Sequence, residues 1–341
     1  MQDEADSAPE AVFNEFLVHG GLIRPDAAPR YTALTGGVSS DIWRVDLPDR
    51  QFCIKRALKK LKVADDWFVP ISRNANEVAW LQTANQILPG SAPEVLAHDA
   101  DAGMFAMEFI AADEAPLWKE ELRHGNADIT FAAATGRALA TIHARTAAMP
   151  DLAERFATDD TFHAIRLEPY LETTARRHPD LAAQLMSLVK ITAQTKIALV
   201  HGDVSPKNIL VRASGPVFLD AECAWWGDPA FDLAFCLNHL LLKCLWTPQT
   251  APAFLKCFHA LADAYLDTLP VPLAGSVEVR TAHLLPGLFL ARIDGKSPVE
   301  YITNEADKDR VRRVARGLLS SPVTGLSSVL DHWAREIGVS L

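Results

Sequence analysis

The chain has 341 residues, which is long enough for two domains or for one two-lobed domain with a sizeable core. Its content of 49% hydrophobic and 22% charged residues is ordinary for a soluble globular protein. The formal net charge of −10 disfavours broad binding to nucleic acid or to an anionic membrane, and it mildly favours a cationic substrate.

The cysteines and the apolar segments indicate a cytoplasmic protein. The five cysteines are odd in number and form no CxxC pair, so we interpret them as reduced, buried thiols and not as a disulfide frame or a zinc site. The acidic N-terminal stretch lacks the features of a secretory signal. The longest apolar runs contain Pro and Gly and are too short to span a bilayer. We expect no membrane partner, and nothing in the sequence indicates an oligomeric state.

The first third of the chain predicts a mainly β unit. Helical spacing of apolar residues predicts a leading helix over 11–22 and another helix over 76–88. Short strand-like runs bounded by turn residues predict a hairpin and two further strands. These four strands are expected at 41–47, 51–57, 94–100 and 104–110.

From about residue 129 onward the pattern is mostly helical. Apolar periodicity predicts helices over 131–144, 181–194 and 231–245. We therefore predict an α+β protein with a mainly antiparallel-β lobe over 1–111 and a larger helical lobe over 112–341.

The stretch HGDVSPKN (201–208) is the most informative segment of the chain. It places Asp203 five positions before Asn208, and an apolar strand and FLD then lead to Asp220. Phosphoryl transfer requires positioning, neutralisation of charge by a metal ion, and a base that orients the attacking hydroxyl. An Asp on a loop can accept the hydroxyl proton, and an Asn and a second Asp can bind Mg²⁺ through oxygen. The alternative is that these residues only shape turns.

The same residues resemble those of the aminoglycoside phosphotransferase and choline kinase family, which has the protein-kinase-like fold. The resemblance runs from about residue 33 to beyond residue 240, and HGDVSPKN followed by FLDAE is its most specific part. It implies that Asp203 is the catalytic base, that Asn208 and Asp220 are ligands of Mg²⁺, and that His201 supports the loop.

The resemblance also implies a lysine on a strand of the first lobe, where it holds the α- and β-phosphates of ATP. Lys55 in CIK fits this position, and Glu77 on the following helix is its natural partner. The run MFAMEFI (104–110) is then the strand between the lobes, and its backbone at Glu108 and Ile110 can pair with adenine. The alternatives are a solvated strand lysine and a charge on a helix surface.

The loop LTGGVSSDIW (34–43) precedes the strand that carries the lysine. Gly36 and Gly37 permit a tight turn there, and backbone N–H groups together with Ser39 and Ser40 can approach phosphate oxygens. A plain turn is the alternative, because most paired glycines belong to turns.

Two departures from the protein-kinase pattern favour a small acceptor. The position two residues after the catalytic Asp holds Ser205, and a lysine stands instead at Lys207. Only a short segment separates Asp220 from Asp232, so there is no room for the activation segment on which a protein substrate docks. The resemblance implies that Asp232 braces the catalytic loop through backbone N–H groups. An ordinary carboxylate at a helix start is a compatible interpretation.

One candidate for the acceptor site is the segment ARIDGKSPVEY (291–301). Arg292, Asp294 and Lys296 follow a long apolar run there and can face the cleft. The alternative is a simple helix stop, in which a helix ends at Gly295.

Other acceptor candidates lie near the metal ligands and in the second lobe. Glu222 can support the metal or touch the substrate, and Trp225 and Trp226 can line a pocket or pack in the core. Glu168 and Glu172 would suit a polyamine, although acidic residues on surface helices are common.

These observations predict a kinase that is dependent on ATP and Mg²⁺ and phosphorylates a hydroxyl of a small molecule, such as an aminoglycoside, an amino alcohol or a sugar. A nucleotide-binding pseudokinase that acts as a binding module is the alternative from another class. Nucleotidyl transfer onto a protein on the same fold is a third possibility. The complete set of charged and metal-binding residues argues against the pseudokinase, and the ordinary order of the metal and base residues argues against nucleotidyl transfer.

Overall fold

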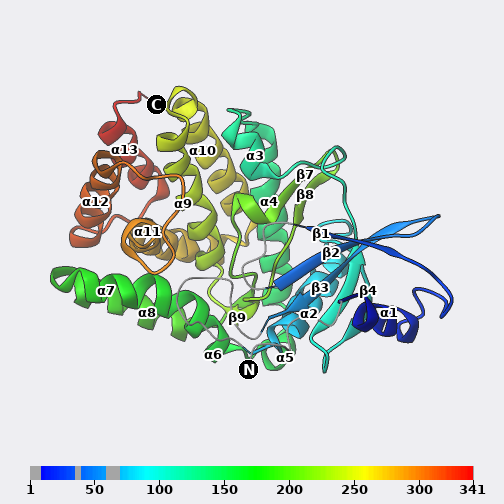
Figure 1. Ribbon diagram of the computed structural model, residues 1–341. Helices are drawn as coiled ribbons and strands as arrows, with labels where there is room; N and C mark the ends of the chain where they lie inside the picture. The colour runs from blue at the N-terminus through cyan, green and yellow to red at the C-terminus, as the bar shows by residue number, and fades with distance from the viewer. Residues whose placement is uncertain (1–8, 35–39, 59–69, 341) are drawn as a thin grey trace, which may run out of the picture.

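The computed structural model of the chain describes residues 9–34, 40–58 and 70–340. They form a smaller lobe around an antiparallel sheet and a larger, mostly helical lobe, and Figure 1 shows α12 (Glu305–Ser320) and α13 (Leu326–Ile337) at the edge farthest from the sheet. The α+β class predicted from the sequence is confirmed.

The sheet of the smaller lobe has the strand order β1-β2-β3-β5-β4, and every neighbouring pair is antiparallel. The predicted hairpin and the two further strands are present within one or two residues of their expected bounds. The strands are β1 (Arg30–Leu34), β2 (Ser40–Asp46), β3 (Gln51–Ala57), β4 (Val95–Asp99) and β5 (Met104–Glu108).

Two helices of this lobe position the lysine strand β3. Helix α1 (Pro9–His19) packs Phe13 and Leu17 into a cluster with Phe52 and Ile54 of β3. Side chains alternate between the faces of a strand, so Lys55 lies on the face opposite to α1. Helix α2 (Arg73–Ile87) follows β3 in the chain and presents its buried side chains to the larger core.

The larger lobe is built from helices that pack around α9 (Ala230–Trp246), a helix whose residues are buried on every side from Ala230 to Cys244. Gly136 permits close packing of α4 (Ile129–Ala147) on α10 (Ala251–Thr268), because a Cβ at this position would lie 2.2 Å from the carbonyl oxygen of Leu261. The predicted helices correspond to α4, α8 and α9. The helices that precede α12 are α3 (Trp118–Arg123), α4 (Ile129–Ala147), α5 (Leu152–Arg155), α6 (Asp159–Phe162), the wide π-helical segment η1 (His163–Glu172), α7 (Thr173–Arg177), α8 (Ala182–Gln194), α9 (Ala230–Trp246), α10 (Ala251–Thr268) and α11 (Val271–Asp294).

Two short strand pairs in this lobe hold the candidate catalytic segments. Strand β6 (Ala198–Val200) pairs with β9 (Trp225–Gly227), and β7 (Ile209–Arg212) pairs with β8 (Gly215–Phe218). The segment HGDVSPKN connects β6 to β7 and ends in a short 3₁₀ turn, η3 (Pro206–Asn208). Asp220 follows β8, so both predicted segments lie at the ends of the same hairpin.

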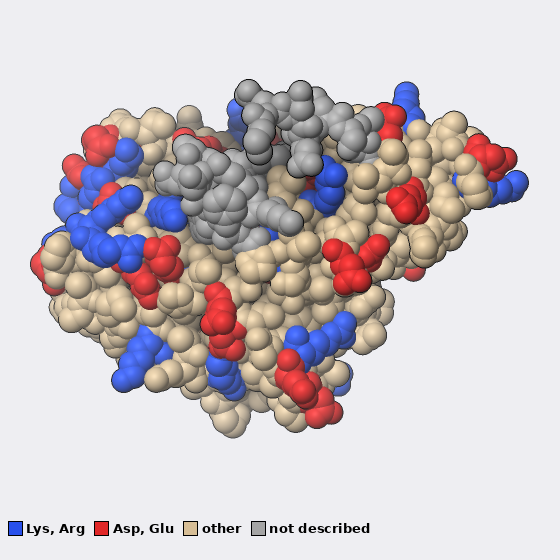
Figure 2. Space-filling view, turned by 60° about the horizontal axis from the view of Figure 1, so that its bottom comes forward, with Lys and Arg blue, Asp and Glu red and all other residues tan. Residues whose placement is uncertain are grey.

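The surface charge and the lengths of the helices are those of an ordinary globular protein. On the face shown in Figure 2, acidic and basic side chains of the described residues lie next to one another. Among the described helices, none is both long enough and apolar enough to cross a lipid bilayer.

Candidate active site

The centre of the site is the carboxylate of Asp203, which is held between two cations. Its Oδ2 lies 3.1 Å from Nη2 of Arg166 and 3.1 Å from Nζ of Lys207. The Asp203 side chain is only 6% exposed. Lys207 therefore brings its ammonium to this carboxylate from four residues further along the loop.

The contact with Arg166 was not predicted from the sequence. Arg166 lies in η1, and its guanidinium also donates to the backbone carbonyls of Gly202 and Ile165. Segments of π-helix are rare and often occur at functional sites. No local signal marks Arg166, because its approach to the loop is set by the packing of η1 in the folded lobe.

Asp232 of α9 accepts hydrogen bonds from the backbone N–H groups of the loop. Its Oδ2 lies 2.7 Å from the backbone nitrogen of His201, and its Oδ1 lies 2.8 Å from that of Gly202. Gly202 has φ +80°, and a Cβ at this position would lie 2.6 Å from the Cys223 carbonyl oxygen. These contacts are the ones that a bracing role requires.

A buried chain of side chains orients the Asp232 carboxylate in turn. Nε2 of His143 lies 3.2 Å from its Oδ2, and Nδ1 of His143 lies 2.8 Å from the hydroxyl of Tyr265. This arrangement fits a histidine that donates a hydrogen bond from Nε2 to Asp232 and accepts one at Nδ1 from the Tyr265 hydroxyl.

His201 joins the HGDVSPKN loop to the segment before Asp220. Its Nε2 donates to the Leu219 carbonyl at 3.0 Å, and its Nδ1 accepts from the backbone N–H of Asp203 at 3.1 Å. Burial lowers the pKa of His201, which favours the neutral ring that this donor and acceptor pattern requires. Its ring packs edge-on against Trp80 of α2 at 4.6 Å.

Lys55 connects the two lobes through a pair of carboxylates. Its Nζ lies 2.7 Å from Oε2 of Glu77 and 2.5 Å from Oδ1 of Asp220. Burial alone would lower the pKa of Lys55, but the charges of Asp220 and Glu77 raise it above its ordinary value. The structure thus brings together the predicted lysine, its predicted partner and a predicted metal ligand.

Asp220 and Asn208 form a donor set that fits Mg²⁺. Burial opposes ionisation of Asp220, yet Lys55 and Lys207 hold its pKa below the usual range, so it is a carboxylate. The side-chain nitrogen of Asn208 donates to the Asp203 carbonyl at 3.1 Å, which leaves the amide oxygen for another partner.

The protein alone does not form a complete metal cage here. Among the described residues, no group of three or more His, Cys, Asp or Glu side chains is placed to hold a metal ion. A carboxylate and an amide oxygen nevertheless suit Mg²⁺, which commonly binds one or two protein oxygens together with the phosphates of its substrate.

The residues expected around the nucleotide are described only in part. Ser40 is the buried first residue of β2, whereas Gly36, Gly37 and Ser39 lie outside the described residues. At the end of β5, Glu108 donates its backbone N–H to the Glu94 carbonyl at 2.8 Å. Ile110 follows this strand and packs against the small cluster of Ala115, Leu210 and Val217.

The candidates near Asp220 make contacts inside the protein. Oε2 of Glu222 lies 2.9 Å from Nε of Arg73, which is a buried residue of α2. Trp225 is buried, stacks on Phe162 at 4.1 Å, and donates from Nε1 to Asp159 at 3.0 Å. These contacts favour core packing for Trp225.

The three charged residues of 292–296 lie in different surroundings and do not form one group. Helix α11 ends at Asp294, whose carboxylate pairs with Arg312 at 2.8 Å and with His178 at 2.9 Å. The backbone N–H of Lys296 donates to the Pro169 carbonyl. Of the three residues, Arg292 is the one that lines a cavity next to the HGDVSPKN loop.

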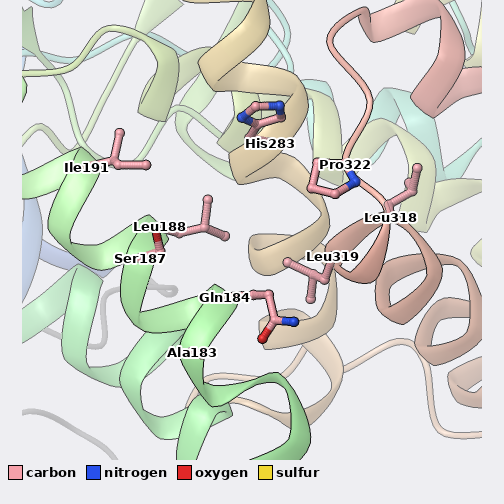
Figure 3. Close-up of a pocket in the computed structure, with 9 residues that line it drawn as sticks. All are labelled: Ala183, Gln184, Ser187, Leu188, Ile191, His283, Leu318, Leu319 and Pro322. Atoms are coloured by element: carbon pink, nitrogen blue, oxygen red, sulfur yellow. The ribbon is translucent and has the colours of Figure 1, made fainter.

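This cavity has a volume of about 30 Å³ and lies beside Ser205, Pro206 and Lys207 of the loop. A second cavity of about 340 Å³ lies between α8, α11 and α12, and Figure 3 shows Gln184 and His283 among its mostly apolar neighbours. No predicted site residue lines the second cavity.

Comparison with known proteins assigns the family. A profile of the phosphotransferase enzyme family, APH, matches residues 30–245, which is more than half of the chain, and the chain belongs to this family. A methylthioribose kinase of Yersinia pseudotuberculosis is 27% identical over 229 residues, which cover 58% of this chain and 54% of that protein. The chain therefore spans about half the length of the curated relatives it matches.

Two solved structures show the same fold. A choline kinase from Cryptosporidium parvum has a TM-score of 0.58 at 13% identity, over 94% of this chain and 99% of that chain. An ethanolamine kinase from Plasmodium vivax has a TM-score of 0.57 at 12% identity, over 96% and 92% of the two chains. The predicted protein-kinase-like fold is confirmed.

Proposed function

We propose that the protein is an O-phosphotransferase that uses ATP and Mg²⁺ to phosphorylate a hydroxyl of a small molecule. The observation that carries this proposal is the ion pairing of Lys55 with both Glu77 and Asp220. A lysine from one lobe and a carboxylate from the other meet there, beside the loop that bears Asp203. Phosphoryl transfer depends mainly on such positioning and on electrostatic stabilisation.

On the nucleotide side, we assign Lys55 to the phosphates and Glu77 to holding its ammonium in place. Asp220 and Asn208 would hold Mg²⁺, which when bound neutralises charge on the phosphate oxygens. The other assignments, carried over from the sequence analysis, place backbone groups of the hinge at the adenine and the glycine-serine loop at the phosphates. These residues are Glu108, Ile110, Gly36, Gly37, Ser39 and Ser40.

On the acceptor side, Asp203 takes the proton of the attacking hydroxyl. The acceptor oxygen forms a bond to the γ-phosphorus, the bond from that phosphorus to the bridging oxygen breaks, and ADP leaves with the electron pair. Arg166 and Lys207 fix the Asp203 carboxylate, while Asp232 and His201 fix the backbone of its loop. A base that is held in one orientation contributes through general-base catalysis.

Several observations support a small acceptor and a cytoplasmic setting. The short segment from Asp220 to Asp232 leaves no docking platform for a folded protein. All five cysteines are free and buried, as expected for thiols in a reducing compartment. We place the boundary between the lobes at residues 111 and 112, close after the end of β5.

A metabolite screen tests the proposal. The protein is incubated with a small-molecule extract, Mg²⁺ and γ-labelled ATP, and labelled organic phosphates are separated from labelled orthophosphate. We expect label in at least one alcohol, and none with the Asp220→Ala variant. A protein that binds Mg·ATP but labels no organic compound would instead be a nucleotide-binding module.

A further inference from the structure

The cavity beside the catalytic loop adjoins the proposed base. Lys207 contributes to its wall and lies 3.1 Å from the Asp203 carboxylate, and Ser205 and Pro206 of the same loop form the adjacent wall. Helices α9 and α11 contribute His239, Lys243 and Arg292. A group bound in this cavity would therefore lie within a few atoms of the base.

The charges around the cavity are mostly positive. Lys207, Lys243, Arg292 and Lys119 are among the described residues that line it, and Glu300 is the single carboxylate in that set. Glu300 is paired with Lys119 at 2.5 Å, so its charge is already compensated. Lys207 is paired with Asp203 at 3.1 Å, so Lys243 and Arg292 are the two cations of the lining that give the cavity a positive potential despite the negative net charge of the chain.

Lys243 is buried without an anionic partner. Its residue is 1% exposed, and its Nζ makes no hydrogen bond or ion pair with any residue in the part of the chain that the structure describes. The ammonium lies over the rings of Trp246 at 4.2 Å and Tyr301 at 4.6 Å. A cation held in this way is available for an anion that enters the cavity.

Other polar atoms around the cavity also lack partners. Within the described residues, four buried side-chain atoms of the lining make no hydrogen bond: Ser205 Oγ, His239 Nε2, Arg292 Nε and Tyr301 Oη. Leaving such a buried group unpaired is unfavourable, because it has lost its hydrogen bonds to water and gained none in the protein. Several unpaired groups around one cavity indicate a site whose partners arrive with a ligand.

We propose that the acceptor carries a carboxylate, which binds in this cavity while its hydroxyl reaches Asp203. The inference rests on the proposed function, and it narrows the substrate class to hydroxy acids. The cavity of about 30 Å³ accommodates a small anionic group, and a carboxylate suits it better than a bulkier phosphate. Arg292 and Lys243 provide charge-assisted hydrogen-bond donors for its oxygens.

The acidic residues considered for a polyamine do not oppose this assignment. Glu168 forms an ion pair with Arg176, and Glu172 lies 2.8 Å from His163. Neither residue lines the cavity. The negative net charge of the chain weakly favoured a cationic substrate, but the positive charge around the cavity favours an anionic one.

Fractionation of the metabolite extract before the reaction tests the inference. The extract is separated by ion exchange into anionic, neutral and cationic fractions, and each is incubated with the full chain, Mg²⁺ and γ-labelled ATP. We expect labelled product from the anionic fraction, also after that fraction has been treated with a phosphatase that is then removed. Label that appears only in a compound without a carboxyl group, from the neutral or cationic fraction, would overturn the inference while the phosphotransferase proposal stands. Loss of labelling after phosphatase treatment would show that the anionic group of the acceptor is a phosphate and not a carboxylate, and it would overturn the assignment.

A variant then tests the assigned cavity with the acceptor that the screen yields. Lys243→Met keeps the side-chain stem and removes the charge, and we expect the KM for the acceptor to rise on the order of ten- to a hundred-fold. The KM for ATP is expected to stay within roughly two-fold, because only one substrate loses a contact. Lys256→Met, at an exposed position of α10, is the matched control and should leave both constants unchanged. Equal acceptor constants for parent and Lys243→Met would overturn the assignment.

Discussion

Replacing Lys243 by Met is expected to stabilise the fold, because the lysine is a buried cation without an anionic partner. Burial, together with the charge of Lys119, lowers the pKa of Lys243 from 10.5 to about 7, and Glu300 opposes this only in part. This change corresponds to a cost of roughly 5 kcal/mol in the free energy of unfolding at pH 6. The contacts with Trp246 and Tyr301 offset about 1 kcal/mol each. The net gain for Lys243→Met is then about 3 kcal/mol at pH 6.

The pH dependence of this gain follows from the direction of the pKa change. Between pH 7 and pH 10.5 the unfolded chain keeps the proton on Lys243 and the folded chain has lost it, so the parent gains stability as the pH rises. The Met variant lacks this contribution, and its advantage is expected to shrink to below about 2 kcal/mol at pH 9.

Urea unfolding at pH 6 and pH 9, followed by circular dichroism, measures both values. The Lys256→Met variant serves as the control for general effects of the substitution. A Lys243→Met variant that is less stable than the parent at pH 6 would contradict this prediction, because it would show that the lysine is paired and stabilising.

Three further predictions concern the site and its surroundings. Asp220→Ala should abolish productive Mg·ATP binding, whereas Asn208→Ala should weaken it and raise the Mg²⁺ optimum; unchanged metal dependence in titrations of both variants would remove them as ligands. Asp232→Asn should lower the free energy of unfolding by about 2–4 kcal/mol and reduce kcat, since one carboxylate oxygen would no longer accept a hydrogen bond from the loop backbone. Denaturation curves and kinetics that match those of the parent would show that Asp232 does not brace the loop. Asp294→Asn should lower stability by about 1 kcal/mol through its partner Arg312 and leave both Michaelis constants unchanged, whereas a higher acceptor KM would return Asp294 to the acceptor site.

The parts of the site that local sequence encodes could be predicted. HGDVSPKN contains the loop residues contiguously, and the turn, the 3₁₀ segment and the following hairpin all depend on neighbours in the chain. Lys55 lies in a strand-like run and Glu77 in the helix that follows it, so the local pattern of the chain was enough to predict this pair. The predicted strands and helices were accordingly confirmed to within a few residues.

The parts that depend on packing between distant segments could not be predicted. Arg166 reaches Asp203 only because η1 packs against the loop, and nothing in its own segment indicates this contact. Lys243 and His239 belong to a helix whose composition indicates core, and their polar side chains within it were the available signal. The triplet at 292–296 appeared to be one charged group, but the end of α11 turns Arg292 and Asp294 toward different partners.

Whether Asp203 is the base is decided by comparing the parent with Asp203→Asn for nucleotide binding and for phosphoryl transfer. We predict Mg·ATP affinity within a few-fold of the parent and a loss of transfer to the acceptor by orders of magnitude, because Asp203 acts on the acceptor hydroxyl. Asp203→Asn turnover near the parent level, with binding intact, would show that Asp203 is not the base.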